Sequence, residues 1–315
     1  MTGTPTGCCD GAVLVTGGAG FVGSHLCEAL VALGRRVRVL DDFSAGNAAN
    51  LAHIWHAVEL VEGSVESPHA VERAMRGVES VVHLAARTSV AESLTEPARY
   101  EAVNLGGTRR VLDAAAHARV RRVVFAASSS AYGTHDAPQD ESMTPEPLSP
   151  YAATKVEGER LVRALAEGGL GTDAVSLRFF NIYGPRQDPN SAYAGVVARF
   201  ATRVAAGLPV AIFGDGEQTR DFIHVSDAVR ALVAALDAVE PLGGGVVNIG
   251  TGRATSVRGL ADAVGAVAGR SVAVEFREAR AGEVRHSVAA TGRAARMLGF
   301  RAETALEAGL ATMMR

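Results

Sequence analysis

Tyr151 and Lys155 are the residues of this sequence whose types and spacing best suit proton transfer. They are four positions apart, and on a helix that spacing places both side chains on one face, one turn apart. A nearby cation stabilises a phenolate and lowers the pKa of tyrosine from its ordinary value of about 10. Such a tyrosine is able to act as a general base or acid near neutral pH. Alone, the pattern is common and favours an ordinary surface helix, so the rest of the chain must decide.

A glycine-rich turn near the start of the chain is a second candidate site. The apolar run Ala12–Thr16 leads directly into Gly17, Gly20 and Gly23, and the amphipathic segment Ser24–Leu33 follows. Strand, glycine turn and helix in this order allow close approach of a phosphate to the backbone and to helix N–H groups. The context predicts a dinucleotide-binding turn.

Two acidic residues follow the next apolar run. Arg36–Leu40 predicts a second strand, and Asp41 and Asp42 stand at its tip, Asp41 being 18 residues after Gly23. An acid at this place accepts hydrogen bonds from a ribose diol and repels a 2′-phosphate. The pair therefore favours NAD over NADP, although an acid here also suits a simple turn cap.

Further apolar runs alternate with helical segments along the first part of the chain, and 89–118 is expected to be mostly helical. This alternation predicts an α/β fold with a doubly wound parallel sheet. The remaining predicted strands are Val58–Val61, Val81–Ala86, Arg122–Ala127 and Val175–Phe180.

Ligands of such sheets bind at the carboxyl ends of the strands. Ser128 stands at one of these ends, where a catalytic residue and a local cap are equally reasonable readings. His83 lies within another predicted strand, and we expect it to be a buried, hydrogen-bonded histidine rather than a catalyst.

The character of the sequence changes near Asn181, where loops lengthen and turn residues increase. We predict a dinucleotide-binding Rossmann domain over residues 11–180, to which 221–250 return. A second, smaller α/β substrate-binding lobe is predicted from 181–220 and 251–315.

The composition of the chain indicates which classes of partner and which cellular compartment to expect. A net charge of −3 gives no basic surface for nucleic acid. Cys8, Cys9 and Cys27 are odd in number and lack metal-ligand spacing, which predicts a reducing compartment, no disulfides and no metal site. No apolar run reaches 18 residues, so no membrane partner is expected. Met1–Asp10 lacks the apolar core of a secretory signal, which favours the cytoplasm.

These motifs together resemble the extended short-chain dehydrogenases/reductases. Among them the chain is most similar to the NAD-dependent nucleotide-sugar epimerase/dehydratase family, on the side of bacterial UDP-glucose and UDP-N-acetylglucosamine 4-epimerases. The resemblance runs from Val13 to about Phe300. The segments that carry it, in order, are Gly17–Leu26, Asp41, His83–Ala86, Asn104, Ser128, Tyr132-Gly133, Ser149–Lys155, Arg178–Arg186, Arg220–Asp227 and Asn248–Gly252.

The resemblance implies reversible oxidation at C4 of a UDP-hexose, with NAD held tightly and a transient 4-keto sugar. Ser128 would hydrogen-bond the sugar hydroxyl and Tyr151 would take its proton. Lys155 would hold the nicotinamide ribose and lower the pKa of Tyr151.

The resemblance also implies two sets of ligand contacts. One departure from the family is Gly63-Ser64, where the usual motif is Gly-Asp beside the adenine. The implied cofactor set is Gly17, Gly20, Phe21, Val22, Gly23, Asp41, Asp42, Ser44, Gly46, Asn47, Gly63, Ser64, Leu84, Ala85, Ala86, Asn104, Ala126, Tyr151, Lys155 and Phe179. The implied substrate set is Thr88, Val90, Ser128, Ser129, Ser130, Asn181, Gly195, Val196, Val197, Ala211, Phe213, Gln218, Arg220, Arg280, Glu283 and Ser287.

Within the substrate set, the resemblance implies that Asn181, Arg220 and Arg280 meet the diphosphate, since arginine binds phosphate oxygens in a bidentate manner. Val196 and Phe213 would flank the base. Ser287 would leave room beside C2 of the sugar, which admits N-acetylated hexoses as well as plain ones.

Several readings remain open at this stage. Family dehydratases carry Asp-Glu after the serine or threonine, whereas Ser129 and Ser130 stand here, which favours an epimerase. The alternatives are an epimerase of another nucleotide sugar such as UDP-glucuronate or dTDP-glucose, a dehydratase, or a non-enzymatic NAD sensor. Apolar residues on more than one face of the helices at 89–118 and 151–165 indicate a covered face, and we expect a homodimer. The resemblance implies that the two copies pair through these helices as a four-helix bundle.

Overall fold

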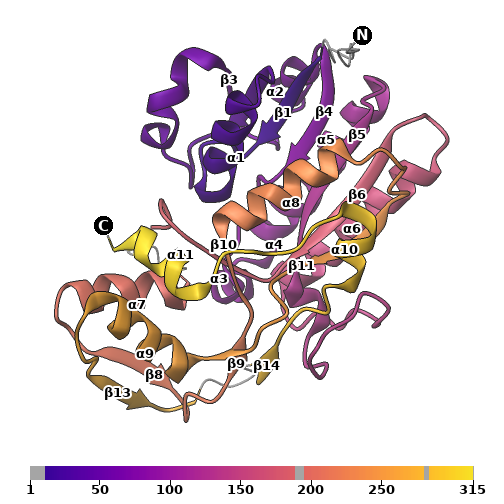
Figure 1. Ribbon diagram of the computed structural model, residues 1–315. Coiled ribbons are helices and arrows are strands. Elements are labelled where there is room, and N and C mark those ends of the chain that lie inside the picture. The colour runs from indigo at the N-terminus through magenta and orange to yellow at the C-terminus, as the bar shows by residue number, and fades with distance from the viewer. Residues whose placement is uncertain (1–10, 189–194, 280–283, 315) are drawn as a thin grey trace, which may run out of the picture.

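A seven-stranded parallel sheet forms the larger part of the molecule in the computed structural model (Figure 1). The structure describes residues 11–188, 195–279 and 284–314. The strand order is β11-β6-β5-β4-β1-β2-β3, which is the doubly wound arrangement expected from the sequence. The strands are β1 (Ala12–Thr16), β2 (Val37–Asp41), β3 (Val58–Glu62), β4 (Val78–His83), β5 (Arg122–Ser128), β6 (Asp173–Phe179) and β11 (Gly245–Ile249).

Both faces of this sheet are covered, and successive strand residues enter opposite cores. Val13 and Val15 of β1 pack in one apolar cluster, while Leu14 between them packs in the other. Because both faces are buried, the strands are continuous apolar runs rather than alternating ones. This explains why the strands were recognisable in the sequence.

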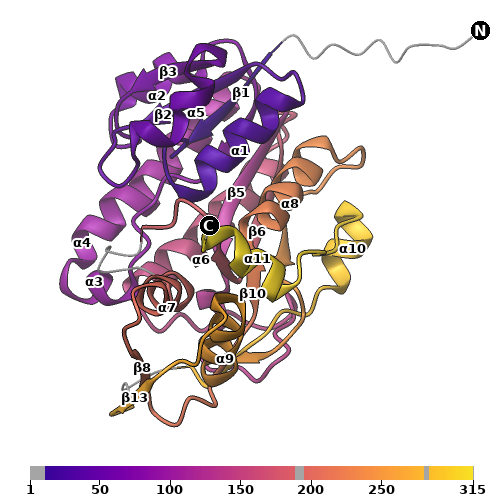
Figure 2. The same cartoon turned by 60° about the vertical axis from the view of Figure 1, so that its left-hand side comes forward.

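The helices form two layers around the sheet (Figure 2). The first cluster is covered by α1 (Phe21–Ala32), α8 (Val225–Asp237) and α10 (Gly292–Leu298). The second is covered by α2 (Pro68–Met75), α5 (Gly107–His117) and α6 (Pro150–Glu167). Shorter elements complete this part: η1 (Ala48–Ala57), α3 (Val90–Thr95), α4 (Pro97–Tyr100), the π-helical η2 (Glu101–Gly106) and η3 (Ser129–Tyr132).

A smaller lobe lies beyond the carboxyl ends of the large sheet, at the bottom of Figure 1. Its apolar cluster packs α7 and α9 against β8 and α11. The elements outside the large sheet are β7 (Asn181–Tyr183), α7 (Val196–Ala205), β8 (Val210–Phe213), β9 (Thr219–Arg220), β10 (Phe222–His224), β12 (Thr255–Ser256), α9 (Val257–Ala268), β13 (Val274–Arg277), β14 (His286–Ser287) and α11 (Leu306–Met313).

The chain passes between the lobes more often than the predicted boundaries allow. β11 pairs with β6 in the large sheet, and Ala294 of α10 and Phe300 pack in the first cluster of that sheet. The segment 251–315 is therefore divided between the lobes. We propose that the substrate lobe consists of 181–220, 251–287 and 303–315, with 288–302 returning to the larger lobe.

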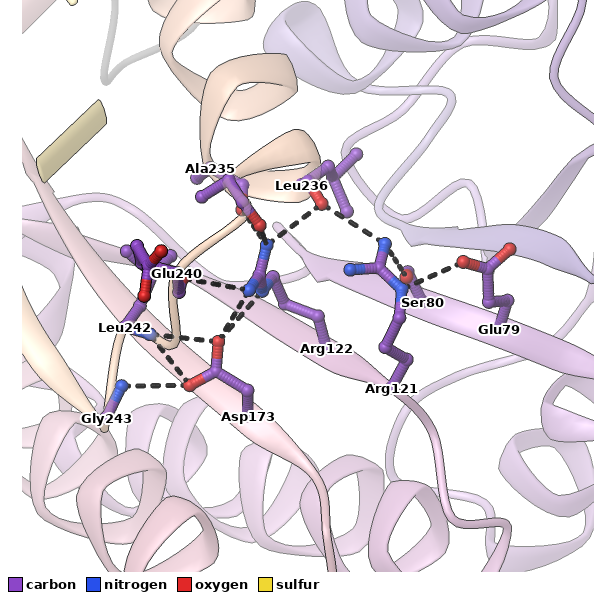
Figure 3. A network of polar contacts seen from close by, with 11 residues as sticks. Glu79, Ser80, Arg121, Arg122, Asp173, Ala235, Leu236, Glu240, Leu242 and Gly243 are labelled. Carbon is purple, nitrogen blue, oxygen red and sulfur yellow. Dashed lines mark hydrogen bonds and ion pairs between the residues drawn. The ribbon is translucent and has the colours of Figure 1, made fainter. Parts of the chain in front are cut away.

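A network of hydrogen bonds and ion pairs lies at the amino ends of β5 and β6 (Figure 3). Arg122 and Asp173 are register partners and form an ion pair of 2.9 Å. The Arg122 guanidinium also donates to the carbonyls of Ala235 and Leu236 in the last turn of α8. Helix ends leave such carbonyls without partners, so one arginine satisfies the end of α8 and fixes it to the sheet.

Within the described residues, no helix is long and apolar enough to cross a membrane.

Candidate active site and dinucleotide cleft

The glycine turn joins β1 to α1 with very little space for side chains. A Cβ on Gly23 would lie 2.1 Å from the carbonyl oxygen of Gly17, and Gly17 itself has a φ of +70°. Gly20 caps α1 without a side-chain hydrogen bond, and the first turn carries no acidic residue. The first N–H groups of α1 therefore face the turn without a side-chain acceptor, which suits an anion.

A cleft of about 1040 Å³ opens over this turn. Asp41, at the carboxyl end of β2, accepts hydrogen bonds of 2.8 Å from the backbone N–H groups of Ala19 and Phe43. Burial raises the pKa of Asp41, and these two hydrogen bonds oppose the rise. The carboxylate thus ties the glycine turn to β2 while keeping unused acceptor sites for a diol.

The structure brings most of the predicted cofactor set to this cleft. Thr88, predicted for the substrate, lies here as well. The predicted cofactor residues in its wall are Gly17, Gly20, Phe21, Val22, Gly23, Asp41, Asp42, Ser44, Gly46, Asn47, Gly63, Ser64, Leu84, Ala85 and Ala86.

The Asn104 side chain forms its hydrogen bonds with other groups of the protein. Its amide accepts a hydrogen bond from Arg87 N at 2.8 Å and donates to Arg87 O and to Thr154 Oγ1. The side chain is buried and joins the loop after β4 to α6. Asn104 therefore shapes the cleft from behind its wall.

The wall includes a segment for which no role had been predicted. Arg186, Gln187 and Asp188 line the cleft although they follow β7, far along the chain. Arg186 has a φ of +66° and its Nη2 lies 2.8 Å from Glu28 Oε2 on α1. The motif Tyr183-Gly184-Pro185-Arg186 was the available signal, but only the fold shows that it reaches this cleft.

Tyr151, Ser128 and Lys155 lie together at the carboxyl end of β5. Tyr151 opens α6, which begins at Pro150 with Ser149 as its cap, the serine Oγ accepting from Ala152 N. The Ser128 side chain lies near enough to the Tyr151 hydroxyl to act on its pKa. Lys155 Nζ donates to the Ala126 carbonyl at 2.7 Å and lies 6.0 Å from the Tyr151 ring centroid.

A glycine brings α6 close enough to the sheet for this contact. A Cβ on Gly158 would lie 2.5 Å from the Phe125 ring. The helix therefore packs directly on Phe125, and Lys155 Nζ stands 5.0 Å over that ring. The ammonium reaches the Ala126 carbonyl because the helix can approach the strand this closely.

The pKa of Tyr151 in this structure is raised, opposite to the net direction predicted, and the contribution of Lys155 to it stays a prediction. Burial raises the pKa of Tyr151, and the Ser128 side chain is what opposes the rise. Burial also lowers the pKa of Lys155 to about 8. Sequence spacing gave the shared helix face, but the size of the desolvation effect depends on the packing of α6 against the sheet.

His83 is a buried structural residue, as predicted. Its ring nitrogens meet Thr16 Oγ1 at 2.7 Å and Thr108 Oγ1 at 2.9 Å. Burial lowers its pKa to about 3, so the ring stays neutral. It fixes β4 against β1 and α5 behind the cleft.

The predicted substrate residues are spread around the small lobe and the strand ends. Arg220 and Ser287 are register partners in β9 and β14, and Asn181 Nδ2 donates to Asp221 O beside them. Val90 is 47% exposed on α3, while Val197 is buried in the core of the small lobe. Ser129 and Ser130 form the first turn of η3, and Ser130 Oγ donates to Ser128 Oγ.

Four predicted residues lie at two elements of the small lobe that contact each other. Gly195 caps α7, Val196 begins it, and Ala211 and Phe213 lie on β8. Gln218 donates to the Phe213 carbonyl at 2.8 Å, and its own Oε1 is buried without a hydrogen-bond partner. Such an acceptor suits a ligand donor. Arg280 and Glu283 lie outside the described residues.

The glycine turn, the acid at the end of β2 and the Ser128, Tyr151 and Lys155 cluster can be compared with those of known protein families. The model of the NAD dependent epimerase/dehydratase family matches residues 13–250. The chain belongs to this family. The glycine cradle, the free first turn of α1 and the acid at the tip of β2 fit NAD in the cleft.

Individual members of the family cover almost the whole chain. The UDP-glucose 4-epimerase of Mycolicibacterium smegmatis is 41% identical over 95% of this chain and 96% of its own length. The crystal structure of the Thermotoga maritima UDP-glucose 4-epimerase with UDP-glucose has a TM-score of 0.90 at 37% identity, covering 96% of this chain and 97% of that one.

A related family member differs in its sugar. The UDP-N-acetylglucosamine 4-epimerase of Methanobrevibacter ruminantium, solved with UDP-N-acetylmuramic acid, has a TM-score of 0.91 at 32% identity. It covers 96% of this chain and 97% of its own. Because members of this family differ in their sugar, family membership alone does not identify the substrate, which depends on the residues of the sugar site.

Proposed function

We propose that this protein is an NAD-dependent 4-epimerase of UDP-hexoses. The observation that carries the proposal is the grouping of Ser128, Tyr151 and the buried Lys155 at the carboxyl end of β5, on the sheet edge where the dinucleotide cleft opens. A non-enzymatic NAD sensor has no need for a buried tyrosine held against a serine. When bound, NAD supplies a reversible acceptor for the hydride at C4.

The residues of the chain supply positioning and proton transfer. Tyr151 takes the proton of the sugar 4-hydroxyl and later returns it, and Ser128 hydrogen-bonds the same oxygen. Lys155 provides positive charge behind Tyr151 and would donate a hydrogen bond to the ribose of bound NAD. Arg220, beside Ser287 in the small lobe, meets the diphosphate, whose binding energy holds a sugar that must turn over within the site.

Two serines argue against elimination of water from the sugar. Ser129 and Ser130 follow Ser128, and their hydroxyls cannot transfer protons as carboxylates do at neutral pH. We therefore expect 4-epimerisation without formation of a 4-keto-6-deoxy sugar.

The experiment is to follow purified, NAD-loaded protein by NMR with UDP-glucose, UDP-galactose, their N-acetylated counterparts, UDP-glucuronate and dTDP-glucose. Conversion of a UDP-hexose to its C4 epimer is expected. Accumulation of a 4-keto-6-deoxy product would show a dehydratase, and absence of turnover with every sugar would favour a sensor.

Ser287 is proposed as the residue beside C2 of the sugar. A serine leaves space that a tyrosine would fill, so both N-acetylated and plain hexoses are admitted. Ser287→Tyr should remove activity on the N-acetylated pair and spare the plain pair. Ser287→Ala is the control, because it removes the hydroxyl without filling space. Equal loss on both pairs in Ser287→Tyr would reject this role.

We further propose a homodimer through the helices at 89–118 and 151–165. In support, α3 of the first segment packs against α6 and exposes Val90 and Leu94, which is 63% exposed. Light scattering at micromolar concentration should give the dimer mass. A monomer mass would contradict the proposal without affecting the proposed reaction.

A further inference from the structure

Glu159 is a buried carboxylate on the same face of α6 as Lys155, four residues further on. Its exposed fraction is 6%, and that of Lys155 is 5%. A buried carboxylate is unfavourable unless it is paired. Here Arg178 of β6 forms the pair, with Nε and Nη2 each donating to a different carboxylate oxygen at 2.7 Å.

Arg178 is itself held in place from a third direction. Its guanidinium lies 4.5 Å from the centroid of the Tyr132 ring. The Tyr132 hydroxyl donates to Asn248 Oδ1 at 2.6 Å, which connects the arrangement to β11. The Glu159 carboxylate therefore has one fixed orientation, set by a bidentate pair whose arginine is stacked on a ring.

Lys155 has no comparable partner of its own. Its ammonium donates a hydrogen bond to the neutral Ala126 carbonyl, and it forms no ion pair with any of the described residues. Burial lowers the pKa of Lys155, and the negative charge of Glu159 acts in the opposite direction. The charge on Lys155 thus depends on a carboxylate one helical turn away.

We propose that Glu159 is a positioning residue that keeps the Lys155 ammonium charged within the fold, with Arg178 holding the carboxylate in place. The inference rests on the proposed function, in which Lys155 acts behind Tyr151. A neutral amine would not stabilise a phenolate at Tyr151. The titratable and charged groups that face this region are Tyr151 and Glu159 on α6, His83 on β4, Arg178 on β6, Tyr132 on η3, Tyr100 on α4, Glu92 on α3 and Arg87 in the loop after β4.

The composition of the chain provides a direct test, because Lys155 is the only lysine in the sequence. Lysine labelled with ¹³C at Cε therefore gives a single side-chain NMR signal in the NAD-loaded protein. The titration midpoint in the unaltered protein should lie near 8. In Glu159→Gln it should fall by roughly one to two pH units, as expected for charges one helical turn apart at an effective dielectric constant near 20. An unchanged midpoint would overturn the proposal.

Glu157→Gln is the matched control. The substitution and the helix are the same, but the Glu157 side chain is 44% exposed and pairs with Arg160. The Lys155 midpoint should not move in this variant. A shift as large as that of Glu159→Gln would mean that any charge on α6 suffices, and the specific role of Glu159 would be rejected.

Glu159→Gln leaves Arg178 buried without its partner, which is able to prevent folding. The double variant Glu159→Gln/Arg178→Gln removes both charges and keeps two amides of similar shape. The Lys155 midpoint should remain low in this variant. A midpoint restored to the value of the unaltered protein would show that the fall in Glu159→Gln came from the unpaired Arg178 charge, and would overturn the proposal.

Kinetics give a second readout. Because activity requires charged Lys155, the alkaline limb of kcat should move to lower pH by the same amount as the NMR midpoint, with little change in KM. A uniform loss at every pH would indicate a structural role instead. The NMR midpoint needs no sugar, so this test stands even if the panel of UDP-sugars gives no turnover.

Discussion

Charged side chains are paired differently at the two ends of strands β5 and β6. At the amino ends, Arg122 pairs with Asp173 and donates to the end of α8, so each charge meets its partner directly (Figure 3). Near the carboxyl ends, the Arg178–Glu159 pair is complete, but Lys155 meets only a neutral carbonyl and Tyr151 lies beside the Ser128 side chain. The first arrangement joins elements, and the second leaves groups able to exchange protons.

The difference is visible in the pKa directions. At the carboxyl ends, burial raises the pKa of Tyr151 and lowers that of Lys155. Paired charges at one end contribute stability, and underpaired groups at the other are tolerated because the surrounding sheet is rigid. Substitutions at the two ends should therefore have separable effects.

The largest effect is expected from Tyr151→Phe. Loss of the proton-transfer group should lower kcat by about 10³-fold, while the free energy of unfolding changes little. Steady-state kinetics with the preferred UDP-sugar and urea denaturation measure the two quantities. Tyr183→Phe is the control, since the Tyr183 hydroxyl only donates to Leu306 O in the small lobe. Near-normal turnover in Tyr151→Phe would remove Tyr151 from the mechanism.

Arg122→Met should produce the opposite pattern. It leaves Asp173 and the last carbonyls of α8 without their main partner, which should cost about 3–5 kcal/mol in the free energy of unfolding. The kcat of the folded fraction should be unchanged. Arg121→Met is the matched control, because Arg121 is 42% exposed and should cost less than about 1 kcal/mol. A fall in kcat with intact stability would contradict the separation of the two ends.

The buried His83, behind the cleft, should make the free energy of unfolding depend on pH. Its folded pKa of about 3 lies below the ordinary 6.5, so the unfolded chain binds the extra proton between these values. The resulting stability is fully present above pH 6.5 and is lost as pH falls towards 3. Between pH 7 and 4.5 the loss should be about 3 kcal/mol, and it should be smaller in His83→Asn. Urea denaturation at both pH values measures it, and equal losses would refute the assignment.

The smallest effect is expected from Asp237→Asn. Asp237 lies at the end of α8 and pairs with Arg35, but the two side chains are 41% and 31% exposed. A half-exposed ion pair contributes less than about 1 kcal/mol. Thermal unfolding at low and high salt should show little difference from the unaltered protein. A loss comparable to that of Arg122→Met would mean that burial is not what distinguishes the Arg122–Asp173 network.

The sequence predicted those parts of the molecule that depend on local spacing. The strand, turn and helix around Gly17–Gly23, the alternation of strands and helices that gives a parallel sheet, and the shared face of Tyr151 and Lys155 all follow from residues close together in the chain. The direction of the Tyr151 pKa did not, because it depends on how deeply α6 is buried. The same holds for Arg186, which reaches the cleft only through the path of the chain after β7.

The burial of Lys155 also determines how the folded protein meets amine-directed reagents. Because the sequence has no other lysine, its surface positive charge is carried by guanidinium groups, which acylating and reductively alkylating reagents leave unmodified at neutral pH. Apart from the α-amine at the start of the chain, a succinimidyl ester meets its single lysine target only when α6 moves away from the sheet. The rate at which one label appears at Lys155 therefore reports the opening of the active site itself, with no background from the rest of the surface.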